Sequence, residues 1–297
     1  MEDPTYFIAL SLLQGDLGLK VVPIPMDKEG IDVRQLQLAV EKEKIEVEEG
    51  RSWAMVYTIP NYHNPTGITM SRERARALLQ LATRHDMLVF CDDVYNLLSY
   101  QEKAADSFSR LRAVEEAGQS CVISNGSLSK VLAPGVRLGW IEASPAIVSR
   151  LSQSGVLQSG GSLNNLTSGL VTSLLSLGLL DTWLLHCKDQ YRERMAAALA
   201  QLQHLPEGWQ VMKPGGGYFL WVTGPKDLTA FCSHLKAEAG VAVLAGPRAS
   251  SSHYVSPVTS GPRAQANAFR LSVAFYTVER IAAACREIVR LAASEDV

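Results

Sequence analysis

The most constraining feature of the sequence is a strand–helix–strand pattern between residues 54 and 91. Ala54–Ile59 and Met87–Cys91 are short, mostly apolar runs, which predict strands buried on both faces. Between them, Ser71 is a candidate N-cap for an amphipathic helix. The apolar residues of this helix recur at the spacing of one helical face, at Ala75, Leu78, Leu79 and Ala82. Such strands are typical of parallel sheets covered by helices on both sides, so we expect an α/β fold.

The remaining pattern predicts two domains. Early in the chain, further strands are predicted at Val21–Pro25, Cys121–Ser124 and Leu138–Glu142, and Ser144-Pro145 begins another helix. From about Thr182 a long helical pattern leads into three more strands and a closing helix from Val278 to Val289. These strands are predicted at Tyr218–Val222, Val241–Leu244 and Phe269–Val273. We therefore expect a large domain over residues 1–181, followed by a linker helix and a smaller α+β domain over residues 182–297.

Composition and charge exclude several classes of function. The 28 Lys and Arg residues against 30 Asp and Glu residues give a net charge of −2, without the basic excess that nucleic acids or anionic membranes attract. The 5 Cys and 6 His residues lack the spacing of disulfide frameworks or metal ligands, so no metal site is expected. Scattered cysteines favour a reducing compartment, and the first residues do not resemble a signal peptide, so we expect a cytoplasmic protein.

Two segments have an unusual composition. Leu151–Leu180 contains no Asp, Glu, Lys or Arg, but it is rich in Ser, Asn, Gln and Gly. It has no apolar run near the ~20 residues that span a bilayer, so we expect it to be buried or to line a cavity. Ala249–Pro262 is rich in Ser, Pro and Gly, and it is expected to form a mobile loop.

Three polar motifs each follow a predicted strand, where ligands bind in parallel sheets. They are Asn61-Tyr62-His63-Asn64-Pro65-Thr66-Gly67, Asp92-Asp93-Val94-Tyr95, and Ser127-Leu128-Ser129-Lys130 with Arg137 seven residues later. Taken singly, each also has a structural explanation: a polar turn, helix capping by Asp92 or Asp93, and a solvated turn. A lysine between hydroxyl groups and near an arginine could instead form an imine beside a phosphate-binding group.

In this order, the three motifs resemble those of pyridoxal-phosphate (PLP) enzymes of fold type I. The chain resembles the class I/II aminotransferases over nearly its whole length, and within them the aminoadipate/kynurenine aminotransferase subgroup. Further similar stretches are Glu2-Asp3-Pro4-Thr5-Tyr6, residues 215–221 and Phe269-Arg270-Leu271-Ser272. The resemblance implies a three-layer α/β large domain like that of aspartate aminotransferase and a smaller α+β domain. It also implies a homodimer that moves an amino group between an L-amino acid and a 2-oxo acid.

The resemblance also implies a cofactor site with a role for each motif residue. Lys130 would bind the cofactor aldehyde and move a proton at the substrate Cα. Asp92 would pair with the pyridine nitrogen, and Asn64 and Tyr95 would hydrogen-bond the phenolic oxygen. The phosphate would be bound by three further residues, Ser127, Ser129 and Arg137.

Two further roles follow from the resemblance. Tyr6 matches the ring that stacks on the pyridine face, and Arg270, with Asn64, matches the site of the substrate α-carboxylate. The structural alternatives are packing for Tyr6 and a surface strand charge for Arg270. Tyr218 and Trp221 are expected to belong to the core of a strand.

The family has a segment before the position that corresponds to Met1. It includes two strands of the large sheet, a helix that closes over the substrate, a residue lent to the partner's active site, and a Gly-rich loop that binds the phosphate. The resemblance thus implies that these 297 residues form an N-terminally truncated large domain with unpaired strand edges. We expect them alone to bind PLP weakly and to turn over poorly.

Two alternatives of a different kind stay open from the sequence. One is a non-catalytic fragment or pseudoenzyme of the family, which cofactor absorbance would distinguish from an aminotransferase. The other is a PLP-dependent lyase or cyclising enzyme on the same scaffold, which product analysis would distinguish.

Overall fold

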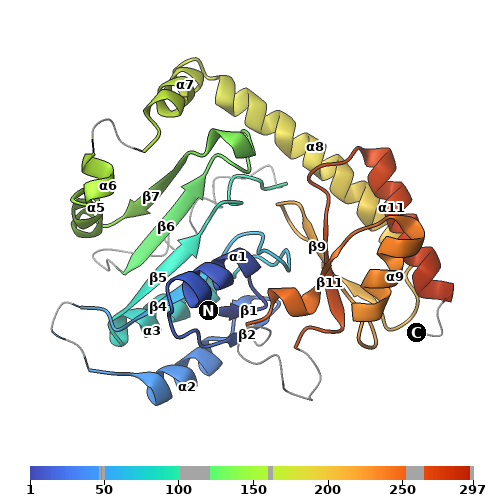
Figure 1. Ribbon diagram of the computed structural model, residues 1–297, viewed down its shortest axis with the longest axis horizontal. Coiled ribbons are helices and arrows are strands. Elements are labelled where there is room, and N and C mark those ends of the chain that lie inside the picture. Colours follow the sequence, from blue (N-terminus) through green and yellow to red (C-terminus); the bar gives the residue numbers. More distant parts are fainter. Residues whose placement is uncertain (47, 49–50, 101–120, 160–162, 252–263, 295–297) are drawn as a thin grey trace. The chain divides into compact units, whose positions relative to one another are not determined.

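The computed structural model describes residues 1–46, 48, 51–100, 121–159, 163–251 and 264–294 (Figure 1). The chain divides into two compact units, and neither is one continuous segment. Unit 1 consists of Met1–Lys28, Tyr62–Thr69 and Gln190–Val297, and unit 2 consists of Glu29–Asn61 and Met70–Asp189. The units change between residues 189 and 190, within the long helix α8 (Leu179–Leu202). The domain boundary at residues 181 and 182 stays a prediction.

Unit 2 contains a four-stranded sheet at the positions that the apolar runs predict. Its strands are β4 (Ala54–Thr58), β5 (Met87–Asp92), β6 (Val122–Ser127) and β7 (Gly139–Ala143), in the order β4-β5-β6-β7. The first three are parallel, and β7 returns antiparallel to β6. The carboxyl ends of β4, β5 and β6 therefore lie at one edge of the sheet, and this edge carries the polar motifs that follow β5 and β6.

The helix between β4 and β5 is α3 (Arg72–Arg84), and it begins where the sequence predicts. The Ser71 hydroxyl accepts a hydrogen bond from the Arg74 backbone N–H, which satisfies one of the free donors of the first turn. The predicted apolar face is buried, with Ala75, Leu78, Leu79 and Ala82 all at most 3% exposed. A similar serine cap, Ser144, begins α5 (Pro145–Ser152).

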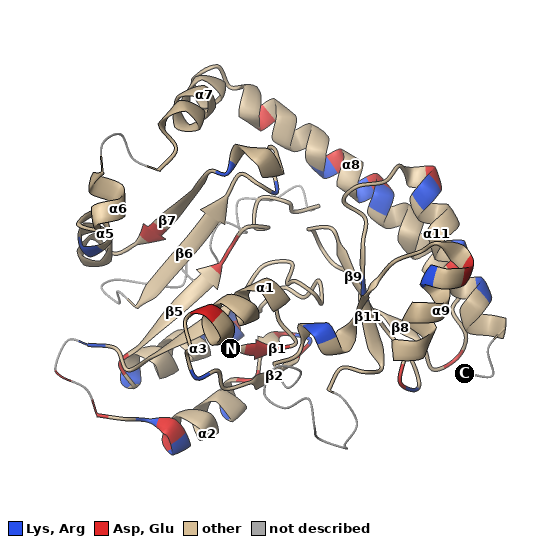
Figure 2. Cartoon of the chain, viewed as in Figure 1, with Lys and Arg blue, Asp and Glu red and all other residues tan. Residues whose placement is uncertain are grey.

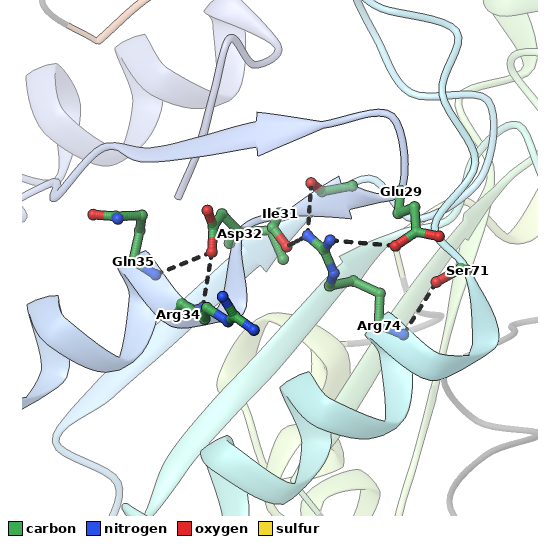
Figure 3. A network of polar contacts seen from close by, with 8 residues as sticks. Glu29, Ile31, Asp32, Arg34, Gln35, Ser71 and Arg74 are labelled. Carbon is green, nitrogen blue, oxygen red and sulfur yellow. Dashed lines mark hydrogen bonds and ion pairs between the residues drawn. The ribbon is translucent and has the colours of Figure 1, made fainter.

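A polar network joins the first turn of α3 to the segment before α2 (Val33–Glu43) (Figure 3). The Arg74 guanidinium donates to the backbone carbonyl of Ile31 at 2.5 Å and lies 3.4 Å from the Glu29 carboxylate. The Asp32 carboxylate caps α2 by accepting from the backbone N–H groups of Arg34 and Gln35. One arginine therefore binds α3 to the short strand β3 (Gly30–Ile31) that leads into α2.

The uncharged stretch Leu151–Leu180 is exposed, so the expectation of a buried or cavity-lining segment is wrong for its described residues. It forms the end of α5, then α6 (Gly155–Gln158), α7 (Asn165–Ser176) and the start of α8. Figure 2 shows that α7 carries no charged residue, yet Leu166 is 79% and Leu170 is 60% exposed. Only Val171 is buried among the described residues of this stretch. Most of its described serines are exposed, and its leucines form an apolar surface.

The same helices also bear on whether the chain has a segment that could cross a membrane. Among the described residues, no single helix is long and apolar enough to cross a bilayer. The pair α7 and α8, bent by 87° at their junction, meets the length and composition requirement only when the two are combined.

Unit 1 contains a second sheet, which has the α+β character expected of the smaller domain. Its order is β10-β11-β9-β8, with antiparallel neighbours. The strands are β8 (Gln210–Val211), β9 (Phe219–Thr223), β10 (Leu244–Ala245) and β11 (Ala268–Ser272). Helices α9 (Thr229–Ala239) and α11 (Val278–Ser294) contact each other, and Phe231 stacks on Phe269 in the core. Tyr218 and Trp221 are both buried, as expected of core residues.

The N-terminal residues belong to this same unit. Strand β1 (Glu2–Asp3) pairs in parallel with β2 (Ile24–Asp27), and helix α1 (Phe7–Leu10) follows. One Asp3 carboxylate oxygen accepts from the Ser250 hydroxyl at 2.8 Å and from the Ser251 hydroxyl at 2.9 Å. The expectation of a mobile loop over Ala249–Pro262 is therefore wrong for residues 249–251, which are fully buried. Residues 252–262 lie outside the described residues.

Candidate functional site

The carboxylate of Asp92 lies at the end of β5 and is held from both neighbouring strands. The Tyr57 hydroxyl on β4 donates to its Oδ2 at 2.6 Å, and the Asn125 side-chain amide on β6 donates to its Oδ1 at 2.9 Å. Asp92 and Asn125 are also direct partners in the strand register. The orientation of this carboxylate is therefore set by the sheet itself. The sequence reasoning missed Tyr57 and Asn125, because the register of neighbouring strands, which places both beside Asp92, has no local signal.

The adjacent Asp93 forms a second, buried group. Its side chain is 1% exposed and accepts from the Asn61 amide and the Ser124 hydroxyl, both at 2.8 Å. Burial raises the pKa of the Asp93 carboxyl to about 6, the two hydrogen bonds partly oppose this, and the nearby carboxylates of Asp92 and Glu142 add to it. In the described residues up to 100, a turn and not a helix follows Asp92 and Asp93, so the capping alternative is wrong for both.

The raised pKa of Asp93 predicts a pH-dependent stability. The folded chain retains this proton up to about pH 6, whereas an unfolded carboxyl loses it near pH 3.8. The contribution of Asp93 to the free energy of unfolding should therefore fall by roughly 3 kcal/mol as the pH rises through this window. Asp93→Asn should remove that loss. The free energy of unfolding of the variant, relative to that of the parent chain, should therefore increase between pH 4 and pH 7. Urea unfolding of both proteins at pH 4 and at pH 7 measures this increase. The same difference in unfolding free energy between variant and parent at both pH values would contradict the prediction.

The turn after β6 brings Ser127, Ser129 and Arg137 together. The Ser129 backbone N–H donates to the Ser127 hydroxyl at 3.1 Å, and an Arg137 guanidinium nitrogen donates to the Ser129 hydroxyl at 3.1 Å. Gly139 faces Ser127 across the strands, and a Cβ on it would lie 2.7 Å from the carbonyl oxygen of Gly126. This close approach of β6 and β7 explains how Arg137 reaches Ser129, eight positions before it in the chain. Lys130 follows Ser129 directly and is half-buried.

Tyr95 lies in the turn that follows Asp92 and is buried, at 3% exposure. Unit 2 therefore carries a fixed carboxylate, two serine hydroxyls, a guanidinium and a primary amine in the segments that follow β5 and β6. Hydroxyl and guanidinium groups are donors suited to a phosphate monoester. Among the described residues, no group of three His, Cys, Asp or Glu side chains could hold a metal ion.

Unit 1 brings together Asn64 and Arg270. An Arg270 guanidinium nitrogen donates to the Asn64 side-chain oxygen at 2.7 Å, and the guanidinium carbon lies 4.2 Å from the centre of the Phe219 ring. Asn64 is buried and Arg270 is half-buried, so the alternative of a surface strand charge is wrong for Arg270. The sequence reasoning missed Phe219, because a ring on a neighbouring strand gives no local signal of contact with an arginine.

Tyr6 lies immediately before α1 and is half-buried. Its ring packs edge-on against Phe7, with 5.7 Å between ring centres. This contact agrees with the packing alternative, and the stacking role of Tyr6 stays a prediction.

Comparison with known proteins identifies a family and several relatives of this chain. The family model described as aminotransferase class I and II matches residues 4–288. The chain is 34% identical over 249 residues to aromatic-amino-acid aminotransferase 1 of Thermococcus litoralis, a match that covers 83% of this chain and 57% of that protein. It is 30% identical over 230 residues to the uncharacterized HTH-type transcriptional regulator YisV of Bacillus subtilis, covering 76% of this chain and 44% of that protein.

Among solved structures, kynurenine aminotransferase of Pyrococcus horikoshii, in complex with PMP, superposes with a TM-score of 0.83 at 28% identity. The match covers 100% of this chain and 69% of that one. The 297-residue chain thus spans little more than half the length of the curated aminotransferase that it matches.

Proposed function

Because the chain belongs to the class I and II aminotransferase family, we propose that it transfers an amino group between an L-amino acid and a 2-oxo acid with pyridoxal phosphate as cofactor. The observation that carries this proposal is the Asp92 carboxylate, fixed by Tyr57 and Asn125 at the end of β5. Within the same unit, the turn after β6 supplies phosphate-binding groups and Lys130.

The chemistry of these donors fits the cofactor. Asp92 would pair with the pyridine nitrogen, where a negative charge favours the protonated ring. Ser127, Ser129 and Arg137 would bind the phosphate through charge-assisted hydrogen bonds. Tyr95, with Asn64, would hydrogen-bond the phenolic oxygen. The bound group supplies an electron-accepting ring, which makes the proton on the substrate Cα removable.

The remaining chemistry belongs to side chains of the protein. The Lys130 amine would hold the cofactor aldehyde, and as a free amine it would carry the proton at the substrate Cα. Arg270 binds the α-carboxylate, because a planar guanidinium can pair with both carboxylate oxygens. The Asn64 oxygen and the Phe219 ring hold that guanidinium in place.

The experiment that tests this proposal combines labelling with turnover. The chain is mixed with PLP, reduced with borohydride and digested, and the pyridoxyl label should map to Lys130. A label on Lys188 or Lys213 would refute the assignment. In parallel, transamination of L-amino acids with 2-oxoglutarate is measured. Bound PLP with pyruvate and ammonia as products would favour a lyase, and bound PLP without turnover would favour a non-catalytic module such as the effector domain of a regulator.

We further propose a cytoplasmic homodimer. The exposed leucines of α7 and α8 support association, because an uncharged apolar surface is stabilised by covering it with another such surface. Light scattering measures the mass in solution, where Leu166→Asp with Leu170→Asp should give a monomer. Leu38→Asp, on the equally exposed face of α2, is the control that should leave the dimer intact.

A further inference from the structure

We propose that His63, held by Glu2, is a positioning residue that fixes Asn64 and thereby the Arg270 guanidinium, so that carboxylate binding depends on the N-terminal strand β1. The inference rests on the proposed function, because it concerns the same carboxylate site. Nothing in the motif chemistry described above uses either His63 or Glu2, although both side chains are only 1% exposed.

The imidazole of His63 has a polar neighbour at each of its two nitrogens. Its Nε2 lies 3.2 Å from a Glu2 carboxylate oxygen, and its Nδ1 lies 2.9 Å from the Thr66 hydroxyl oxygen. The Thr66 backbone N–H also points to Nδ1, at 3.4 Å, so Nδ1 acts as the acceptor. With its proton on Nε2, the imidazole accepts from Thr66 at Nδ1 and places the Nε2–H beside the Glu2 carboxylate, at an N···O distance of 3.2 Å but without the alignment of a hydrogen bond.

The same residue organises the backbone of its loop. The His63 backbone N–H donates to the Ile68 carbonyl at 2.8 Å, and the His63 carbonyl accepts from the Gly67 N–H at 2.6 Å. Asn64 is the next residue, so the anchored imidazole limits where its side chain can lie. The Asn64 oxygen then receives the 2.7 Å hydrogen bond from Arg270.

The loop of residues 62–68 also packs closely against the turn before β9. A Cβ on Gly217, whose φ is +68°, would lie 2.8 Å from the Tyr62 Cβ. A Cβ on Gly67 would lie 3.1 Å from the Phe219 carbonyl oxygen. The loop is therefore held between the Glu2 carboxylate and the start of β9, where Phe219 also contacts Arg270. The Asn64 oxygen and the Phe219 ring both contact the guanidinium, and the packing of this loop against β9 holds both of them. The Glu2–His63 pair completes that packing on the side of β1.

The expected consequence is selective weakening of carboxylate binding. His63→Ala and Glu2→Ala should each raise the Kd for glutarate, a dicarboxylate without a reactive keto group, about tenfold in the PLP-loaded chain. The double variant should be little worse than either single one, because both changes break the same contact. Glu2→Gln retains an acceptor oxygen for the imidazole and should stay within about threefold of the parent.

The controls separate positioning from general damage. Ser251→Ala removes one hydrogen bond to Asp3 on the same strand β1 and should leave the Kd unchanged. PLP absorbance and kcat should stay near the parent values in the His63 and Glu2 variants, while the KM for both substrates rises.

The outcomes are decided by calorimetry and kinetics together. Unchanged glutarate binding in His63→Ala and Glu2→Ala, with binding lost in Arg270→Ala, would overturn this inference and leave the proposed function standing. A loss of PLP absorbance that parallels the loss of binding would also overturn it, because a general structural effect would then be the cause. Glutarate binding that is undetectable in the parent, or that Arg270→Ala does not weaken, would overturn the proposed function and this inference with it.

Discussion

Lys130→Ala is expected to lower the rate of transamination by at least about a thousandfold at saturating PLP. The substitution removes the amine that we propose to hold the cofactor aldehyde and to move the proton at the substrate Cα, and it leaves the neighbouring residues proposed to bind the phosphate unchanged. The Ser129–Arg137 hydrogen bond does not involve the lysine side chain, so PLP should still bind, more weakly. Single-turnover absorbance with an L-amino acid measures the rate of the proton transfer.

The control for this prediction is Lys213→Ala, because Lys213 is an exposed lysine of unit 1 and should retain the parent rate. Methylamine added to Lys130→Ala should recover part of the lost rate by supplying a free base of similar chemistry. A parent-like rate in Lys130→Ala without added amine would show that another group carries the proton.

Asp92→Asn is expected to produce the second-largest loss, about a hundredfold or more in the proton-transfer rate. The amide cannot supply the negative charge that, in the role proposed for Asp92, keeps the pyridine nitrogen protonated, and each pKa unit of lost preference corresponds to about 1.4 kcal/mol. Two such units correspond to about a hundredfold in rate. The change preserves the shape of the side chain, so retention of PLP by absorbance should accompany the loss of rate.

Two milder substitutions test whether the orientation of Asp92 matters as well as its charge. Tyr57→Phe and Asn125→Ala each remove one of the hydrogen bonds that hold the carboxylate. Each should slow the proton transfer by about tenfold, the lower end of the range for one hydrogen bond to a charged group. Rates unchanged in both milder variants and in Asp92→Asn would place the pyridine partner elsewhere.

The positions of the unit 2 strands and of α3 follow from the sequence because their signals are local. Apolar runs of five or six residues marked β4 and β5, and an N-cap serine with a helical repeat marked α3. The motif order after these strands also pointed to the family, which the family match confirms. The roles assigned to individual residues of those motifs stay predictions, for which Asp92 held by Tyr57 and Asn125 is support.

Only the tertiary structure decided which side chains meet. Tyr57 and Asp92 are 35 residues apart, and Asn64 and Arg270 are 206 apart, so strand register and chain path bring them together. The Glu2–His63 pair and the Phe219 ring beside Arg270 likewise depend on packing between distant segments. The same holds for the exposure of Leu151–Leu180, because an uncharged sequence fits an interior and an apolar surface equally well. Local periodicity specifies an element, whereas its partners depend on the whole path of the chain.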